Sequence, residues 1–189
     1  MDRSGHHGLS CSCAEATKGH TRSRDALMEL ATLADPAAES EPVALVSSRP
    51  GLRPADILCS SALRGSLAAL DVGITMPTGF DQDAAERYRQ AKFAKYARYL
   101  EALRLQGIQY LPMIWTAWGR AHPAAAQVLK SLATKAARRR GLISGGDILR
   151  AAKLQIALEI QARNARMVHA CLHQGALRDE EDDVEAPPS

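Results

Sequence analysis

The chain has 189 residues, of which 46% are apolar, so it can bury one hydrophobic core and at most a small second domain. Its formal net charge is only +3, and no window approaches the ~18 apolar residues that a membrane-spanning helix requires. The N-terminus lacks a signal-peptide core, and the four cysteines show no disulfide framework. We therefore expect a soluble, intracellular protein with reduced thiols.

Residues 1–20 are polar and hold a cluster of His and Cys residues. Such clusters bind structural zinc, and His6 to Cys11 has the spacing of the second half of a zinc knuckle, whose first half is missing. One interpretation is a zinc site that uses Cys11, Cys13 and His20. The alternative, which we favour, is a disordered leader with incidental Cys and His residues.

Residues 22–34 are predicted to form a helix that ends at Asp35-Pro36. Its apolar face is made of Leu27, Leu30, Ala31 and Ala34. Glu29 points away from this face, so we do not count it as a metal ligand. Residues 41–46 are the expected first strand, and a turn with Pro and Gly follows.

Two short apolar strands are predicted next, at 53–58 and 67–75, and each carries one carboxylate, Asp56 and Asp71. An unpaired carboxylate inside an apolar strand costs several kcal/mol, so two of them on neighbouring strands suggest a shared hard cation, Mg²⁺ or Mn²⁺. The alternative without a metal has Asp56 as a solvated strand end and Asp71 bonded to a backbone amide.

Residues 83–106 are predicted to form a long helix with one apolar arc. Lys92 and Lys95 fall inside that arc, whereas most other charged side chains of this helix lie outside it. A lysine that faces a core either extends past it to solvent or meets an anion. Next to two strand carboxylates, such a lysine could orient a water or hold a phosphate.

A fourth strand is expected at 108–116, with Pro112 at an edge or bulge, followed by an amphipathic helix at 123–140. A final helix is expected from Ser144 to about His169, and then a disordered acidic tail. We divide the chain into a leader at 1–20, a domain at 21–173 and a tail at 174–189.

The stretch from Ala84 to Arg140 has twelve Lys and Arg residues against two acidic ones. Such an excess attracts polyanions, although a plain solvated face is the commoner meaning of a basic helix. We take DNA as the expected partner. The candidate phosphate-binding residues are Arg87, Lys92, Lys95, Arg98, Lys135, Arg138, Arg139 and Arg140.

Four short motifs occur in order along the chain: Arg-Pro-Ala-Asp at 53–56, Ala-Leu-Asp-Val at 69–72, Ala-Lys-Phe-Ala-Lys-Tyr at 91–96 and Gly-Ile-Gln-Tyr-Leu-Pro at 107–112. Their order and spacing resemble the restriction-endonuclease-like domain of site-specific non-long-terminal-repeat retrotransposon proteins, a branch of the PD-(D/E)xK nucleases. The resemblance spans roughly Thr21 to His169. It implies an α/β fold with an α-β-β-β-α-β core, followed here by two C-terminal helices.

The resemblance also implies roles for particular residues. Asp56 and Asp71 would bind Mg²⁺ or Mn²⁺, and the catalytic lysine would come from the helix, at Lys92 with Lys95 as the alternative. The chain departs from the superfamily pattern because Gly73 stands where the usual motif has lysine, and Ala55 separates Pro54 from Asp56.

Two classes of function follow from the resemblance. The first is a metal-dependent DNA endonuclease, which would be nuclear if it acts on genomic DNA and could work with a reverse transcriptase module. The second is a catalytically inactive nucleic-acid-binding or interaction remnant. Related retroelement proteins carry a zinc knuckle upstream of the nuclease domain, so residues 1–20 would be the truncated end of a longer reading frame.

Overall fold

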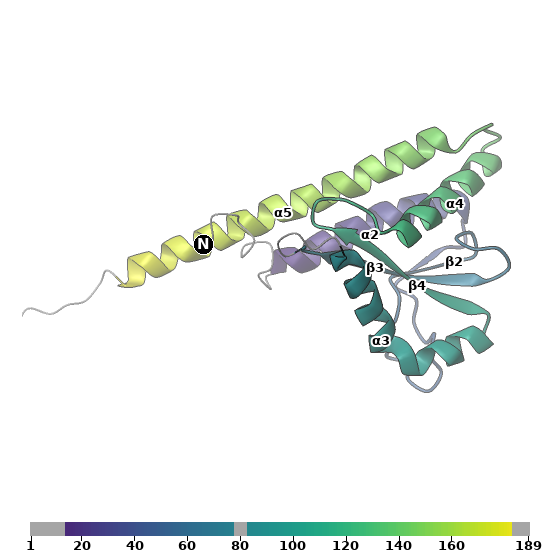
Figure 1. Cartoon of the computed structure of the whole chain (residues 1–189), viewed down its shortest axis with the longest axis horizontal. Coiled ribbons are helices and arrows are strands. Elements are labelled where there is room, and N and C mark those ends of the chain that lie inside the picture. The colour runs from purple at the N-terminus through teal and green to yellow at the C-terminus, as the bar shows by residue number, and fades with distance from the viewer. Residues whose placement is uncertain (1–13, 78–82, 183–189) are drawn as a thin grey trace, which may run out of the picture.

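The computed structural model describes residues 14–77 and 83–182, and it describes side chains from Lys18 to Cys171 within those ranges. The elements follow the order α2 (Ala14–Ala34), β1 (Glu39–Ser40), β2 (Ile57–Cys59), β3 (Leu67–Thr75), α3 (Ala84–Leu105), β4 (Ile108–Thr116), α4 (Pro123–Arg139) and α5 (Gly146–Asp182). Figure 1 shows this arrangement, in which α5 runs beside α2 and continues beyond the rest of the fold.

The strands form one mixed sheet in the order β1-β2-β3-β4. β1 and β2 are antiparallel, as are β2 and β3, whereas β3 and β4 are parallel over nine residue pairs, from Leu67↔Ile108 to Thr75↔Thr116. The parallel pair needs a long crossover, and α3 supplies it. The expected α/β class is therefore confirmed.

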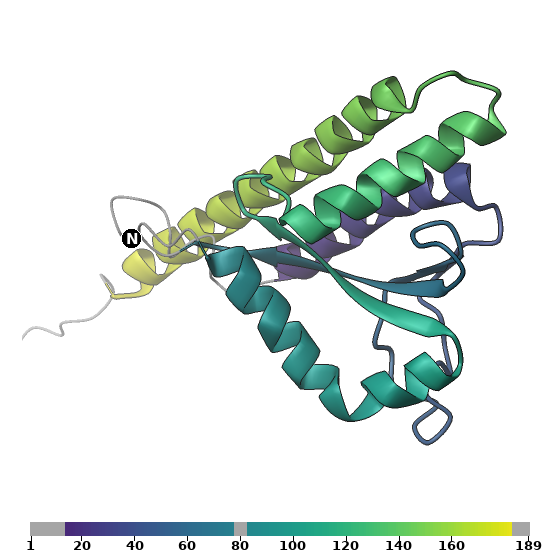
Figure 2. The ribbon, with the colours of Figure 1, turned by 45° about the vertical axis from the view of Figure 1, so that its right-hand side comes forward.

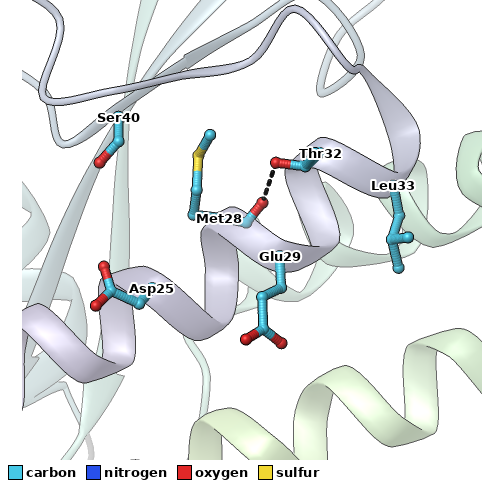
Figure 3. Close-up of a pocket in the computed structure, with 6 residues that line it drawn as sticks. All are labelled: Asp25, Met28, Glu29, Thr32, Leu33 and Ser40. Atoms are coloured by element: carbon cyan, nitrogen blue, oxygen red, sulfur yellow. Dashed lines mark hydrogen bonds between the residues drawn. The ribbon is translucent and has the colours of Figure 1, made fainter.

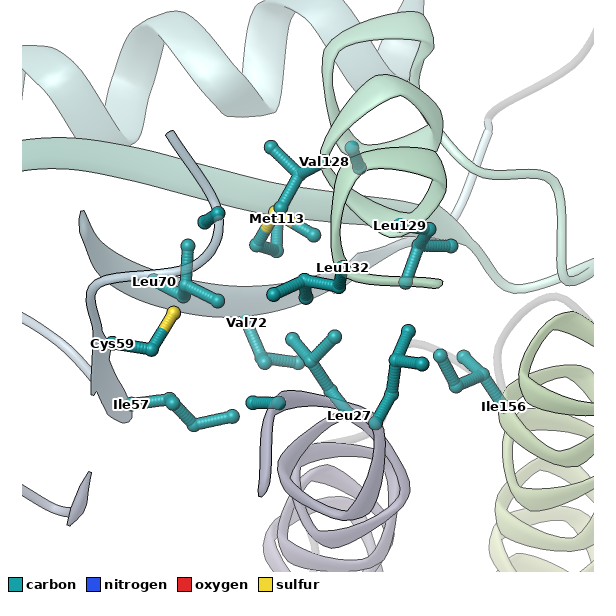
Figure 4. Close-up of a cluster of buried hydrophobic side chains, with 14 of the residues drawn as sticks. Leu27, Ile57, Cys59, Leu70, Val72, Met113, Val128, Leu129, Leu132 and Ile156 are labelled. Atoms are coloured by element: carbon teal, nitrogen blue, oxygen red, sulfur yellow. The ribbon is translucent and has the colours of Figure 1, made fainter. Parts of the chain in front are cut away.

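Helices cover both faces of the sheet, as Figure 2 shows. On one face α2, α4 and α5 pack over a core that includes Leu70, Val72 and Leu132 (Figure 4). On the other face α3 covers a smaller core around Tyr96 and Tyr110. Because side chains alternate along a strand, β3 sends Leu70 and Val72 to the first core and its odd-numbered residues toward α3.

The sequence predicts β3 and β4 to the residue, and α3 and α4 to within one residue at each end. The expected first strand at 41–46 is wrong, because the strand is only Glu39–Ser40. The backbone at Glu41 and Ala44 has positive φ, 51° and 57°, which breaks an extended run. The second strand is also shorter than expected, and Asp56 lies just before it.

Helix α2 begins at Ala14 instead of residue 22, so it includes the last part of the expected leader. The sequence around Gly19 gives a weak helix signal, but α5 packs against this segment. A Cβ at Gly19 would collide with the side chain of Arg163. Close packing of the two helices therefore requires glycine at this position.

Helix α5 also runs further than expected, to Asp182, so the domain boundary that we placed at 173 falls inside it. No helix in the described part of the chain is long and apolar enough to cross a membrane.

Candidate functional site

Asp71 lies in the middle of β3, only 6% exposed, on the face that α3 covers. Its Oδ1 accepts a hydrogen bond from Lys92 Nζ at 2.7 Å, and its Oδ2 accepts one from the Tyr110 hydroxyl of β4. Burial and the neighbouring Asp71 charge raise the pKa of Tyr110, so this hydroxyl keeps its proton and donates. A lysine and a tyrosine from two elements therefore hold this buried carboxylate.

Lys92 reaches Asp71 from α3, and its side chain is only 14% exposed. Its Nζ also donates to the Val72 carbonyl oxygen at 3.2 Å and lies 5.8 Å from the Tyr88 ring centroid. Burial alone would lower the pKa of Lys92, but the charge and hydrogen bond of Asp71 outweigh it and the pKa is raised. Lys92 is therefore a cation at neutral pH.

The absence of a side chain at Gly73 lets Lys92 approach β3. A Cβ at Gly73 would lie 2.7 Å from Tyr88 Cε1, 2.8 Å from Ile114 Cδ1 and 3.4 Å from Lys92 Cε. The space beside β3 that a side chain at position 73 would fill is thus occupied by residues of α3 and β4. Glycine is needed here so that Tyr88 and Lys92 can approach the strand.

We predict that Gly73→Ala destabilises the protein by about 1–3 kcal/mol, because the added methyl overpacks a filled site. Urea unfolding monitored by circular dichroism measures this change. The matched control is Gly51→Ala, since a Cβ at Gly51 meets nothing within 4 Å. Equal stabilities of the two variants would contradict the close packing at Gly73.

Asp56 immediately precedes β2, and the register brings it opposite Asp71, one residue beyond the pair Ile57↔Leu70. Its backbone N–H donates to the Leu70 carbonyl at 2.8 Å, and its Oδ2 accepts from the Val72 N–H at 2.7 Å. Burial raises the pKa of Asp56, and the charge of Asp71 adds to this, while His20 and the Val72 amide oppose it. The amide bond that we considered for Asp71 therefore belongs to Asp56.

His20 joins this group from α2, a contact that the sequence did not indicate. Its Nε2 lies 3.2 Å from the Val72 carbonyl oxygen and 3.5 Å from Asp56 Oδ2. We had considered His20 only as a zinc ligand with Cys11 and Cys13, and those two cysteines lie outside the described residues. The signal in the sequence for the observed role was a histidine about two turns before Leu27, on the same face of the first helix.

Lys95 does not reach the carboxylates. It is exposed, and its Nζ lies 4.9 Å from the ring centroid of Tyr96. Three residues turn a helix by about 300°, so Lys95 lies about 60° around α3 from Lys92 and faces solvent. The expected apolar arc was too wide, because it included Ala91, which is exposed.

The candidate phosphate-binding residues do not form one surface. Arg87, Lys92, Lys95 and Arg98 belong to α3, whereas Lys135, Arg138, Arg139 and Arg140 lie on α4 or directly after it. The two helices pack on opposite faces of the sheet. Lys135 Nζ donates to the Leu63 carbonyl at 3.1 Å, next to the turn between β2 and β3. Only the α3 group therefore shares a face with Asp71.

The Asp56 and Asp71 carboxylates lie beside the Val72 carbonyl and are possible ligands of a divalent ion. In the described part of the chain, no three His, Cys, Asp or Glu side chains converge closely enough to hold a metal by themselves. Mg²⁺, however, binds through one or two carboxylates and keeps several waters. Asp56, Asp71 and the Val72 carbonyl are hard oxygen donors, and burial and the charge of Asp71 raise the pKa of Asp56. This donor set fits Mg²⁺ or Mn²⁺.

A hollow of about 620 Å³ lies away from the Asp71 cluster, between α2 and Ser40 (Figure 3). Its lining carboxylates already have partners: Asp25 pairs with Arg24 at 2.7 Å, and Glu29 accepts from Gln155 at 3.1 Å. None of its lining residues belongs to the group around Asp71. The candidate site is therefore the cluster of His20, Asp56, Asp71, Lys92 and Tyr110.

No protein-family model matches the sequence, and no curated protein matches it significantly.

Proposed function

We propose that the chain is a metal-dependent DNA endonuclease domain of the PD-(D/E)xK type, similar to those of non-long-terminal-repeat retrotransposon proteins. One observation carries the proposal: Lys92 comes from α3, its Cε lies 3.4 Å from the position that a Cβ at residue 73 would take, and its Nζ contacts Asp71 at 2.7 Å. A lysine from the helix thus stands near the place where the usual motif has a strand lysine. The order of helices and strands agrees with the same type of core.

In this proposal Asp56, Asp71 and the Val72 carbonyl would hold Mg²⁺ or Mn²⁺. Such an ion neutralises charge on a phosphoryl group and makes a bound water more acidic. Lys92 Nζ has three N–H donors and uses two of them, on Asp71 and Val72. Its third N–H remains for a water or a phosphate oxygen. Tyr110 fixes the second oxygen of Asp71, and His20 contacts the Val72 carbonyl.

Plasmid nicking tests the proposal directly. The purified protein should convert supercoiled DNA to open circles with Mg²⁺ or Mn²⁺, and EDTA should stop the reaction. Asp71→Asn should abolish nicking, because the ion loses a charged ligand while the side chain keeps its size. Absence of metal-dependent nicking on both duplex and single-stranded DNA would reject the endonuclease and leave the binding remnant.

The alternative function, a nucleic-acid-binding module without catalysis, rests on the basic residues of α3. Duplex affinity should fall steeply with added salt, with a slope of about −0.9 per phosphate contact in a plot of log K against log salt. Replacing Arg87 and Arg98 with Gln should reduce that slope by about two. Fluorescence anisotropy at several salt concentrations measures it.

The control variant changes Arg138, Arg139 and Arg140 to Gln. Its plot of log K against log salt should have the same slope as that of the wild-type protein, because α4 lies on the other face of the sheet from α3. A larger loss of slope in the α4 variant than in the α3 variant would place the DNA on the α4 face and contradict phosphate binding by α3.

A further inference from the structure

Trp118 is an exposed aromatic side chain that the proposed reaction does not use. It is 57% exposed, whereas the other tryptophan, Trp115, is 2% exposed. The ring of a tryptophan in solvent offers a partner a large apolar contact area together with an N–H donor. Trp118 sits in the turn between β4 and α4.

The turn that carries Trp118 is firmly held. Thr116 N–H donates to the Arg120 carbonyl at 2.9 Å, and Gly119 N–H donates to the Thr116 carbonyl at 2.9 Å. Gly119 has φ of 82°, which favours glycine. Helix α5 also holds the turn, because the buried Asn164 side chain donates a hydrogen bond to the Ala117 carbonyl at 2.6 Å. The indole is therefore displayed on an ordered turn, at a low entropic cost for binding.

The turn lies at the end of β3, four residues beyond Asp71. Ala117 N–H donates to the Thr75 carbonyl at 2.8 Å, at the end of the strand that carries Asp71. Figure 2 shows the loop between β4 and α4 at the end of the sheet where α3 begins. A strand that passes Asp71 and Lys92 can thus continue toward Trp118.

The charge beside Trp118 suits a nucleic-acid strand. Arg120 is exposed and borders a hollow of about 220 Å³ between this turn and the start of α3. The hollow is also lined by two acidic residues, Asp83 and Glu86, and the Glu86 carboxylate pairs with His122 at 2.8 Å and with Arg89 at 3.2 Å. The exposed guanidinium can meet a phosphate while the indole meets the neighbouring base.

We propose that Trp118 stacks on an unpaired base of the DNA strand that enters the candidate site, with Arg120 on the adjacent phosphate. This inference rests on the proposed endonuclease function for its choice of DNA. Stacking on an aromatic side chain is tolerant of sequence, because every base offers a π-face. The partner surface is thus a single-stranded or locally opened stretch next to the cut site.

Intrinsic tryptophan fluorescence tests the stacking. The probe is oligodeoxythymidylate, and all proteins carry Asp71→Asn to prevent cutting. In the protein that keeps Trp118, binding of the probe should quench the fluorescence of this residue. Trp118→Phe should still bind within a few-fold, measured by anisotropy, but should lose the quenching. Trp118→Ala should weaken binding by between about five-fold and a hundred-fold. Ile143→Ala, which changes another exposed apolar side chain, should bind as wild type.

An abasic oligonucleotide of the same length separates stacking from phosphate attraction. We expect it to bind more weakly and to leave the fluorescence of Trp118 unchanged. Equal quenching by the abasic strand, or unchanged affinity of Trp118→Ala, would overturn the inference. Quenching without any nicking by wild-type protein would support the stacking and reject only the endonuclease, whereas nicking without quenching would reject only the stacking.

Discussion

Replacing Lys92 with alanine should lower the rate of DNA nicking by a factor on the order of 10² or more, while metal and DNA binding stay nearly intact. Lys92 Nζ is the cation that contacts Asp71 and the Val72 carbonyl, so its removal takes away a positioned charge next to the proposed ion. Single-turnover nicking with excess enzyme separates this loss of rate from a loss of DNA binding.

The matched control for this variant is Lys95→Ala. Both changes remove one lysine from α3, but Lys95 is exposed and its Nζ lies over Tyr96. We expect Lys95→Ala to cut at a rate close to that of wild type, with at most a small change in salt dependence. If both variants cut as fast as wild type, the helix lysine has no catalytic role and the proposed mechanism fails.

Replacing Asp71 with alanine should destabilise the fold by about 3–5 kcal/mol at neutral pH, the usual cost of breaking a buried ion pair. The Asp71 and Lys92 side chains are only 8% and 14% exposed, so the change leaves a desolvated ammonium without its counterion. The Tyr110 hydroxyl loses its acceptor as well. Urea unfolding of the metal-free protein measures the difference.

A second change in the same chain shows whether the lost charge pair is the cause. Lys92→Met keeps the volume of the side chain but removes its charge, so Asp71→Ala with Lys92→Met should be more stable than Asp71→Ala alone. If the added Met change destabilises the protein further, the cost of Asp71→Ala comes from lost packing and not from an unpaired lysine.

The charge of Asp71 stabilises the fold through Lys92, whereas the charge of Asp56 lowers its stability. Because burial and Asp71 raise its pKa, the native state holds the Asp56 proton more tightly than the unfolded chain does. This contribution to stability is present below the unfolded pKa of about 3.9 and is lost as pH rises through the folded value. An ionised Asp56 thus costs stability at neutral pH, as expected for a carboxylate retained for binding a cation.

The regular elements around the site follow from the sequence alone. β3 and β4 are apolar nine-residue runs bounded by turn residues, and this pattern predicts buried strands without fixing their relative direction. The two strand carboxylates stand out for the same reason, since Asp71 interrupts an otherwise apolar run. The first strand could not be found this way, because Glu39–Ser40 is short, exposed and polar.

Only the tertiary structure decides which charges meet. Lys92 and Lys95 both fit a broad apolar arc, and the choice between them depends on how α3 sits over Gly73, where a side chain would block the approach. His20 reaches Val72 across 52 residues because α2 packs against β3, and the basic residues of α3 and α4 separate because the sheet lies between the two helices. Helical periodicity specifies the face of a side chain within its own helix, but the partner of that face depends on packing between distant segments.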